Sequence, residues 1–198
     1  MFNRERANRQ LEFIIEIDKM KNILRRNIVI DKSHRENDAE HSWHIAVMAM
    51  LLEEYAVETI DITHVLKMLL VHDLVEVYAG DTFCYDKAGN RSKRKRESAA
   101  ADKLFSILPN DQNSEIRALW EEFDKAETKD ALYAASVDRL EPFLLNVSTD
   151  GYTWKQGDVT KNMVLKRVEH VKRAMPELYI CILEMLDACV LGGILKDG

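Results

Sequence analysis

The sequence predicts an all-α protein, and three observations support this prediction. Apolar residues recur at helical spacing along almost the whole chain. Only 7 glycines and 3 prolines interrupt the 198 residues, and no repeat or low-complexity linker divides them. Alternation typical of a strand is scarce, and the short segment NIVI at 27–30 is its best candidate. Because this length can bury one sizeable core, we expect a single domain over residues 1–198.

The first helix is expected to carry an apolar face that continues to residue 24. That face is formed by Phe13, Ile17, Met20 and Leu24. A second helix is expected from residue 37 to about residue 56. Its start carries Asn37 as a potential N-cap and Glu40 three residues later, which is the spacing of a capping box.

The rest of the chain also divides into helices. A third helix is expected from Asp61 to Gly80, a glycine suited to the position after a helix C-terminus. A fourth covers about 92–108 and ends before Pro109. Further helices are expected at about 112–125, 129–147, 158–175 and 177–191. The longest non-helical segments are then 25–37, 80–91 and 148–157.

Composition restricts the class of protein and its partners. Hydrophobic residues make up 46% of the chain and charged residues 31%, which is ordinary for a globular protein. The net charge of −6 argues against general nucleic-acid binding, which needs a basic face. No apolar run reaches the roughly 18 residues of a membrane span, and the N-terminus lacks an apolar signal segment. We therefore expect no membrane partner. Three cysteines without CxxC spacing favour reduced thiols in a cytoplasmic protein.

The stretch LLVHDLVEVYAGD at 69–81 places ionisable residues within an apolar helix. His72, Asp73 and Glu76 lie inside it, and Asp81 follows directly after Gly80. Burying a carboxylate or an imidazole without a partner costs several kcal/mol, so a compensating group is required. On a helical wheel His72 and Glu76 share the inward stripe, and Asp73 lies about 100° away from His72.

Two other apolar helix faces carry similar residues. His41 lies on the apolar face of the second helix, and Asp138 lies among small alanines in the helix 129–147. Two imidazoles and two carboxylates can bind a divalent cation, which would neutralise the acids and activate a water molecule. Alternative interpretations without a bound metal stay open at this point. The histidines could be hydrogen-bonded core residues, His72 and Asp73 could be adjacent by chance, Asp138 could pair with Arg139, and the chain could be a plain helical bundle.

Three segments of the chain resemble the H…HD…D signature of the HD-domain metal-dependent phosphohydrolases. They are AEHSWHIAVMA, LLVHDLVEVYAGD and YAASVDRLE. The segments KRKRESAAADKLFSILP and LWEEF are similar to the 5′-deoxyribonucleotidase-like branch of that family. The resemblance implies an HD-domain helical bundle, with a motif-bearing core at about 20–147 and C-terminal helices at about 158–191. It also implies a homodimer, and the C-terminal segment ELYICILEMLDACVLGGIL is apolar on more than one face, as subunit interfaces often are.

The resemblance also implies a role for individual residues. The matching metal ligands are His41, His72, Asp73 and Asp138. Glu76 matches the catalytic glutamate, which can orient or deprotonate the attacking water or later protonate the leaving oxygen, and Asp81 matches a second acid near the phosphoester.

Two arginines match the position where the family binds substrate. In MKNILRRNI, Arg25 stands at the family's substrate arginine and Arg26 follows it. A guanidinium there could hold phosphate with two hydrogen bonds. The family's Gly-Trp is replaced by Asn27 and Ile28, which leaves the base and sugar contacts open.

The resemblance and the residues together predict a metal-dependent phosphomonoesterase. Its expected substrates are nucleoside 5′-monophosphates, with deoxy forms favoured, and its cofactor is one divalent ion such as Mn, Co or Mg. One guanidinium, Arg25, matches one terminal phosphate, whereas a triphosphate calls for more cations than the sequence visibly supplies. The alternatives are a hydrolase of another phosphoester, such as a nucleoside triphosphate or a cyclic nucleotide, and a non-catalytic metal- or nucleotide-binding module.

Three further features have two readings each. His44 is read as a core histidine rather than a residue that supports a ligand. Glu141 could steady a ligand or form a surface salt bridge. The charged segment RSKRKRE at 91–97 is read as a solvated helix start, with substrate screening as the alternative.

Overall fold

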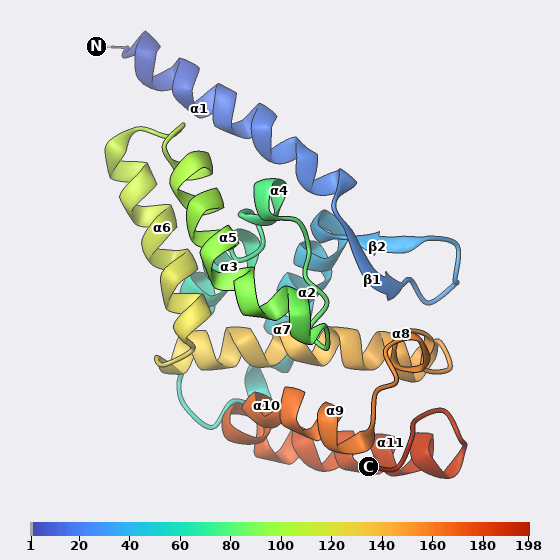
Figure 1. Cartoon of the computed structure of the whole chain (residues 1–198). Coiled ribbons are helices and arrows are strands. Elements are labelled where there is room, and N and C mark those ends of the chain that lie inside the picture. Colours follow the sequence, from blue (N-terminus) through green and yellow to red (C-terminus); the bar gives the residue numbers. More distant parts are fainter. Residues whose placement is uncertain (1) are drawn as a thin grey trace.

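The protein is built of helices around one long central helix, with a single small sheet at its edge (Figure 1). The computed structural model describes residues 2–198. Its helices are α1 (Arg4–Ile17), α2 (Asp38–Leu52), α3 (Ile62–Val71), α4 (Glu76–Ala79), α5 (Lys87–Phe105), α6 (Asn110–Lys125), α7 (Lys129–Ser148), α8 (Tyr152–Gln156), α9 (Lys161–Arg167), α10 (Glu169–Ala174) and α11 (Pro176–Leu191). Short 3₁₀ helices η1 (Asp18–Asn22) and η2 (Glu53–Tyr55) extend α1 and α2. The predicted all-α fold class is confirmed.

Helix α7 lies at the centre of the fold and positions the other elements. Figure 1 shows it crossing the molecule between α9–α11 on one side and α1–α6 on the other. Ala131, Ala134 and Ala135 on α7 are almost completely buried. Such small side chains allow neighbouring helices to approach closely, and α2, α3, α6 and α10 all contact α7. Polar side chains of α7 are therefore held against several other helices at once.

The two strands confirm part of the expected strand and show where the first helix ends. Strand β1 (Leu24–Ile28) pairs antiparallel with β2 (Arg35–Asn37). The prediction that the first helix continues to Leu24 is wrong, because Leu24 pairs with Asn37 as part of the sheet. Within the predicted apolar face, Phe13 and Met20 are buried.

The predicted start of α2 is borne out in atomic detail. The side chain of Asn37 accepts hydrogen bonds from the backbone N–H groups of Ala39 and Glu40, both at 3.0 Å. The side chain of Glu40 accepts from the backbone N–H of Asn37, also at 3.0 Å. This capping box fixes the first turn of α2, where His41 lies.

The prediction of one helix over 61–80 is wrong. Helix α3 ends at Val71, and a turn precedes the single helical turn of α4. Within the turn the backbone bonds tighten, with Leu74 N–H donating to Val71 at 3.1 Å and Glu76 N–H to Asp73 at 2.9 Å. The Leu69 carbonyl accepts a bond from the imidazole of His72 at 2.7 Å, at the point where the α-helical ladder gives way.

The C-terminal part of the chain is also more broken than expected. The predicted helix 158–175 is split into α9 and α10, which meet at Val168. The segment 148–157, expected to be non-helical, contains α8. This short helix follows Gly151, whose φ of +68° favours glycine and whose added Cβ would lie 2.8 Å from the Ile194 carbonyl oxygen. Nowhere within residues 2–198 does a helix combine the length and apolarity that a membrane crossing requires.

Candidate metal centre and adjoining pocket

Four of the predicted residues meet at one buried point between α2, α3 and α7. His41 comes from α2, His72 and Asp73 from the end of α3, and Asp138 from α7. Nε2 of His41 lies 3.2 Å from Oδ1 of Asp138 and 4.0 Å from Oδ2 of Asp73. Nε2 of His72 lies 3.0 Å from Oδ2 of Asp73 and 3.6 Å from Oδ1 of Asp138. Two nitrogens and two oxygens therefore face one another across a few ångströms.

The opposite nitrogen of each imidazole is bound to the surrounding protein. Nδ1 of His41 lies 3.2 Å from Oε2 of Glu141, and Nδ1 of His72 donates to the Leu69 carbonyl at 2.7 Å. This arrangement orients each Nε2 toward the centre, since metal-binding histidines commonly donate their other ring N–H to a carboxylate or a backbone carbonyl. Nε2 of His72 is buried, and its 3.0 Å contact with Asp73 lacks the geometry of a hydrogen bond, so this atom makes no hydrogen bond within the part of the chain that the structure describes. The mixed nitrogen and oxygen donor set and this orphaned atom fit a divalent cation.

The protonation of these groups reflects the concentration of negative charge. Burial lowers the pKa of His72, but Asp73 and Asp138 outweigh this effect and raise that pKa to about 10. Burial and Arg25 lower the pKa of His41, but Asp138 and Glu141 raise it overall to about 9. The pKa of Asp138 falls well below its usual value: burial opposes this, but the imidazoles prevail. A metal ion must therefore displace protons from the imidazoles in order to bind.

The two predicted acids lie beside this centre. Glu76, the first residue of α4, is buried, and its Oε2 has no hydrogen-bond partner among residues 2–198. Burial, followed by the charges of Asp73 and Asp38, raises the pKa of Glu76 well above its usual value. Asp81 follows Gly80, whose φ of +72° turns the chain sharply after α4. Burial also raises the pKa of Asp81, and both acids line the same pocket as His72 and Asp138.

The predicted arginines differ in how they are held. The guanidinium of Arg25 donates to Oδ2 of Asp73 at 2.8 Å and lies 3.5 Å from both Glu36 and Asp38. It is thereby engaged by the carboxylates around the metal centre, and its predicted contact with phosphate stays a prediction. Arg26 is exposed, and its guanidinium lies 5.1 Å above the ring of Phe83 at the pocket edge.

The pocket next to the centre is more cationic than the sequence suggested. It has a volume of about 210 Å³, and five basic residues line it: Arg25, Arg26, Lys93, Arg139 and Arg167. The premise that the site offers one guanidinium is therefore wrong. Arg139 follows the motif residue Asp138 directly, whereas Arg167 stands in α9, where no motif marks it.

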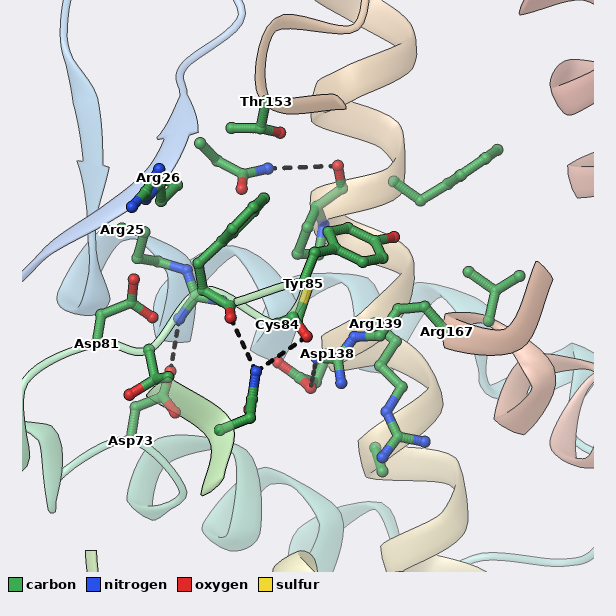
Figure 2. A pocket seen from close by; sticks show the side chains of 18 of the residues that line it. Arg25, Arg26, Asp73, Asp81, Cys84, Tyr85, Asp138, Arg139, Thr153 and Arg167 are labelled. Atoms are coloured by element: carbon green, nitrogen blue, oxygen red, sulfur yellow. Dashed lines mark hydrogen bonds and ion pairs between the residues drawn. The ribbon is translucent and has the colours of Figure 1, made fainter. Parts of the chain in front are cut away.

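Three residues that line the pocket were not singled out from the sequence: Phe83, Tyr85 and Arg167. Figure 2 shows Arg139 and Arg167 on one side of the pocket and Arg25 and Arg26 on the other. The aromatic rings of Phe83 and Tyr85, in the loop before α5, are packed edge to face with centroids 5.4 Å apart. The succession of aromatic residues in TFCY directly after the motif aspartate was a signal that could have indicated them.

Three secondary expectations can now be compared with the structure. Glu141 is completely buried against His41, so the surface salt bridge is wrong. The reading of His44 as a core histidine is also wrong, because its half-exposed ring lies 3.2 Å from Oε1 of Glu141. Helix α5 already begins at Lys87, so 91–97 is not its start, and Lys93 within this segment faces the pocket.

Comparisons with known proteins agree with this geometry. A family model described as HD domain matches residues 17–179. The crystal structure of a predicted metal-dependent phosphohydrolase from Magnetospirillum magnetotacticum MS-1 has a TM-score of 0.91 and 46% sequence identity, covering 96% of this chain and 98% of that one.

Curated relatives are more distant in sequence. The 5′-deoxynucleotidase HDDC2 of Xenopus laevis is 28% identical over 68% of this chain and 66% of its own length. The human 5′-deoxynucleotidase HDDC2 is 27% identical over 72% of this chain and 69% of its own length. The chain thus spans about two thirds of the length of these relatives.

Proposed function

The chain belongs to the HD-domain family of metal-dependent phosphohydrolases, and on that premise we propose that it hydrolyses nucleoside 5′-monophosphates to nucleoside and phosphate, with deoxyribonucleotides favoured. The observation that carries the proposal is the meeting of His41, His72, Asp73 and Asp138 at one end of a compact pocket that also contains Glu76 and Asp81. The names of the curated relatives support the choice of a nucleotide.

In this proposal, the four residues hold one divalent ion such as Mn, Co or Mg. A bound divalent cation would withdraw charge from the phosphoryl group and make water a competent nucleophile near neutral pH. His41 and His72 would contribute their Nε2 atoms, and Asp73 and Asp138 their carboxylate oxygens. Glu141, Leu69 and Arg25 would keep those groups in orientation through the contacts described above.

The acids of the pocket supply the proton transfers. The oxygen of water forms the new bond to phosphorus while the bond from phosphorus to the 5′ oxygen breaks. Glu76 accepts the proton of the attacking water or returns a proton to the departing 5′ oxygen. Asp81 is a second acid within the same pocket, and it would carry out whichever of these two proton transfers Glu76 does not. Glu76 is buried and Asp81 is partly buried, so a proton held on either carboxyl group is at least partly shielded from exchange with bulk water.

The rest of the pocket suits a small substrate with a flat apolar part. Its volume of about 210 Å³ is below the roughly 300–1,000 Å³ typical of sites for larger ligands, which favours a monophosphate over a triphosphate. Phe83 and Tyr85 offer aromatic surfaces on which a nucleobase could stack. The five basic residues favour the second candidate, hydrolysis of a nucleoside triphosphate, since more phosphates require more cationic contacts.

A substrate panel separates the two candidates. Phosphate release is measured from ribo- and deoxyribonucleoside mono-, di- and triphosphates with Mn, Co or Mg, and again with a chelator. The proposal expects inorganic phosphate from monophosphates, and loss of this activity on chelation. Pyrophosphate or triphosphate as the main product would replace it with the second candidate. Protein carrying Glu76→Gln and purified identically controls for contaminating phosphatases.

We also propose a homodimer in a reducing compartment such as the cytoplasm. Three free cysteines, two of them exposed, support the compartment. Helix α11 presents Ile180, Met185 and Leu191 to the outside with exposed fractions of 59%, 41% and 90%. Such an apolar surface is typical of a subunit interface. Light scattering on wild-type protein and on Met185→Glu should give a dimer and a monomer respectively; a monomeric wild type would remove this proposal.

A further inference from the structure

Two guanidinium groups on one wall of the pocket have no hydrogen-bonded carboxylate partner. Nε of Arg139, on α7, is buried and has no hydrogen-bond partner among residues 2–198. Arg167, on α9, has one ion pair within the described chain, to Oδ2 of Asp138, and at 3.7 Å it is too long for a hydrogen bond. Both side chains are only partly buried, so an anion that enters the pocket from solvent can reach guanidinium donors that are still free.

The other basic residues of the pocket have carboxylate or aromatic partners. Arg25 donates to Asp73 at 2.8 Å and lies 3.5 Å from two more carboxylates, although its Nε has no hydrogen-bond partner among residues 2–198. Lys93 lies 3.4 Å from Glu97 on the same helix. Arg26 is exposed and lies over the ring of Phe83. Arg139 and Arg167 are the half-buried cations of the pocket without a close carboxylate partner among residues 2–198.

The electrostatics around this pair point in the same direction. Nearby His170 has its pKa lowered to about 4 by burial and then by Arg139, Arg173 and Arg167. This shift is expected where positive charge is in excess. An anion that entered this part of the pocket would relieve that excess.

Arg167 also lies at the right place relative to the candidate metal centre. Asp138 presents Oδ1 to the two imidazoles and Oδ2 to Arg167, so one carboxylate separates the guanidinium from the centre. Figure 2 shows Arg167 beside Asp138, with Arg139 on the same side of the pocket and Arg25 across it. A phosphoryl group at the centre would lie between these two walls.

We propose that Arg139 and Arg167 form a phosphate-binding wall of the site, across the pocket from Arg25. The inference rests on the proposed function in taking a phosphoryl group as the ligand. A guanidinium can bind two phosphoryl oxygens with parallel hydrogen bonds, which a lysine cannot reproduce. Arg167 would contact the phosphoryl oxygens, and Arg139 would supply the second cationic group of the wall.

Direct binding of inorganic phosphate tests the assignment. Phosphate is titrated calorimetrically into full-length protein saturated with Mg²⁺, for wild type, Arg167→Ala, Arg167→Lys and Arg139→Lys. Arg173→Ala is the matched control, because it removes an exposed arginine of α10 that does not line this pocket. Thermal melts and Mg²⁺ titration of each variant show whether fold and metal affinity are retained.

Loss of a charge-assisted hydrogen bond predicts that Arg167→Ala raises the phosphate Kd by about ten- to a hundredfold. Arg167→Lys should recover part of this loss, Arg139→Lys should weaken binding, and Arg173→Ala should leave the Kd unchanged. Equal Kd values for wild type, Arg167→Ala and Arg139→Lys would overturn the inference, as would a wild-type protein that binds no phosphate. The titration contains no nucleotide, so a failure of the proposed nucleotidase activity would be seen separately in the substrate panel.

Discussion

The two walls of the pocket differ in how their charges are compensated. On the wall next to the metal centre, His41 faces Glu141 and Asp138, and the guanidinium of Arg25 donates to Asp73. Single atoms of Arg25, His72 and Glu76 on this wall are buried without a hydrogen-bond partner among residues 2–198, but each of these side chains lies against the cluster of charged groups around the centre. On the wall contributed by α9 and the neighbouring turn of α7, Arg167 and Arg139 have no hydrogen-bonded partner within residues 2–198. The first wall is thus pre-organised around a fixed centre, and the second leaves its charge available to a ligand. Changes to the first should affect metal and turnover, and changes to the second should affect binding.

The largest effect is expected from Glu76, the buried acid of α4 beside the metal centre. Glu76→Gln should lower kcat by roughly 10²–10⁴-fold, which is the usual contribution of a positioned acid or base. Metal content should not change, since Glu76 is proposed as a proton carrier. Steady-state kinetics and elemental analysis check the two parts. A near-wild-type kcat would make Glu76 a structural residue, and Glu184→Gln on the exposed side of α11 is the matched control.

A buried amide near the end of α7 holds α8 against α7. Oδ1 of Asn146 accepts hydrogen bonds from Thr153 N–H, the Thr153 hydroxyl and Trp154 N–H at 3.0, 2.6 and 3.1 Å. Asn146→Ala should destabilise the protein by roughly 1–3 kcal/mol for each buried donor left without a partner. Denaturant unfolding measures this, with exposed Asn162→Ala on α9 as the control. Equal stability of both variants would show that α8 is anchored by other contacts.

Glu141, which contacts the far side of the His41 imidazole, is expected to increase the metal affinity of the centre. Glu141→Gln keeps the shape of the side chain but removes the charge that faces Nδ1 of His41. Loss of such a partner typically lowers metal affinity by about 10–100-fold. Competition against a metal-binding dye measures the change. If Glu141→Gln binds metal as tightly as wild type, the orientation of His41 must come from its packing alone.

A smaller and graded effect is expected from pH. The pKa values of His41 and His72, about 9 and about 10 in the metal-free protein, mean that both imidazoles carry an extra proton at neutral pH. Metal uptake should therefore release protons, and apparent affinity should rise as pH increases toward 9, by about tenfold per unit for each displaced proton. Calorimetry in two buffers of different ionisation enthalpy counts the protons. Affinity that stays constant between pH 6 and pH 8 would contradict this prediction.

The contrast between the two walls also explains which site residues could be predicted from the sequence. His41, His72, Asp73 and Asp138 stand on apolar faces of long segments, where an ionisable side chain is conspicuous. Their meeting point could be proposed although the helical wheel for 61–80 was wrong in detail. The turn at 72–75 depends on a tertiary environment that a local pattern does not contain, but it leaves His72, Asp73 and Glu76 facing the same buried region.

The phosphate-facing wall could not be predicted in the same way. Arg167 lies in a segment rich in lysine and arginine, where sequence alone does not separate one inward guanidinium from solvated neighbours such as Lys166 and Arg173. It is the last residue of α9 and stands directly before the break at Val168, where one continuous helix was expected. The helix α8 was missed because its start depends on Gly151 and its anchor on Asn146, which are contacts specified by the fold rather than by helical periodicity.

The central claim is that His41, His72, Asp73 and Asp138 together hold a divalent ion. Its most direct test is the metal content of wild type, His72→Ala and Asp138→Ala after identical loading with Mn²⁺ and removal of free metal. Elemental analysis should find about one ion per chain in wild type and almost none in either variant, because each substitution removes one ligand atom of a small set. Circular dichroism confirms that the variants remain folded. Equal metal content in all three folded proteins would contradict the claim.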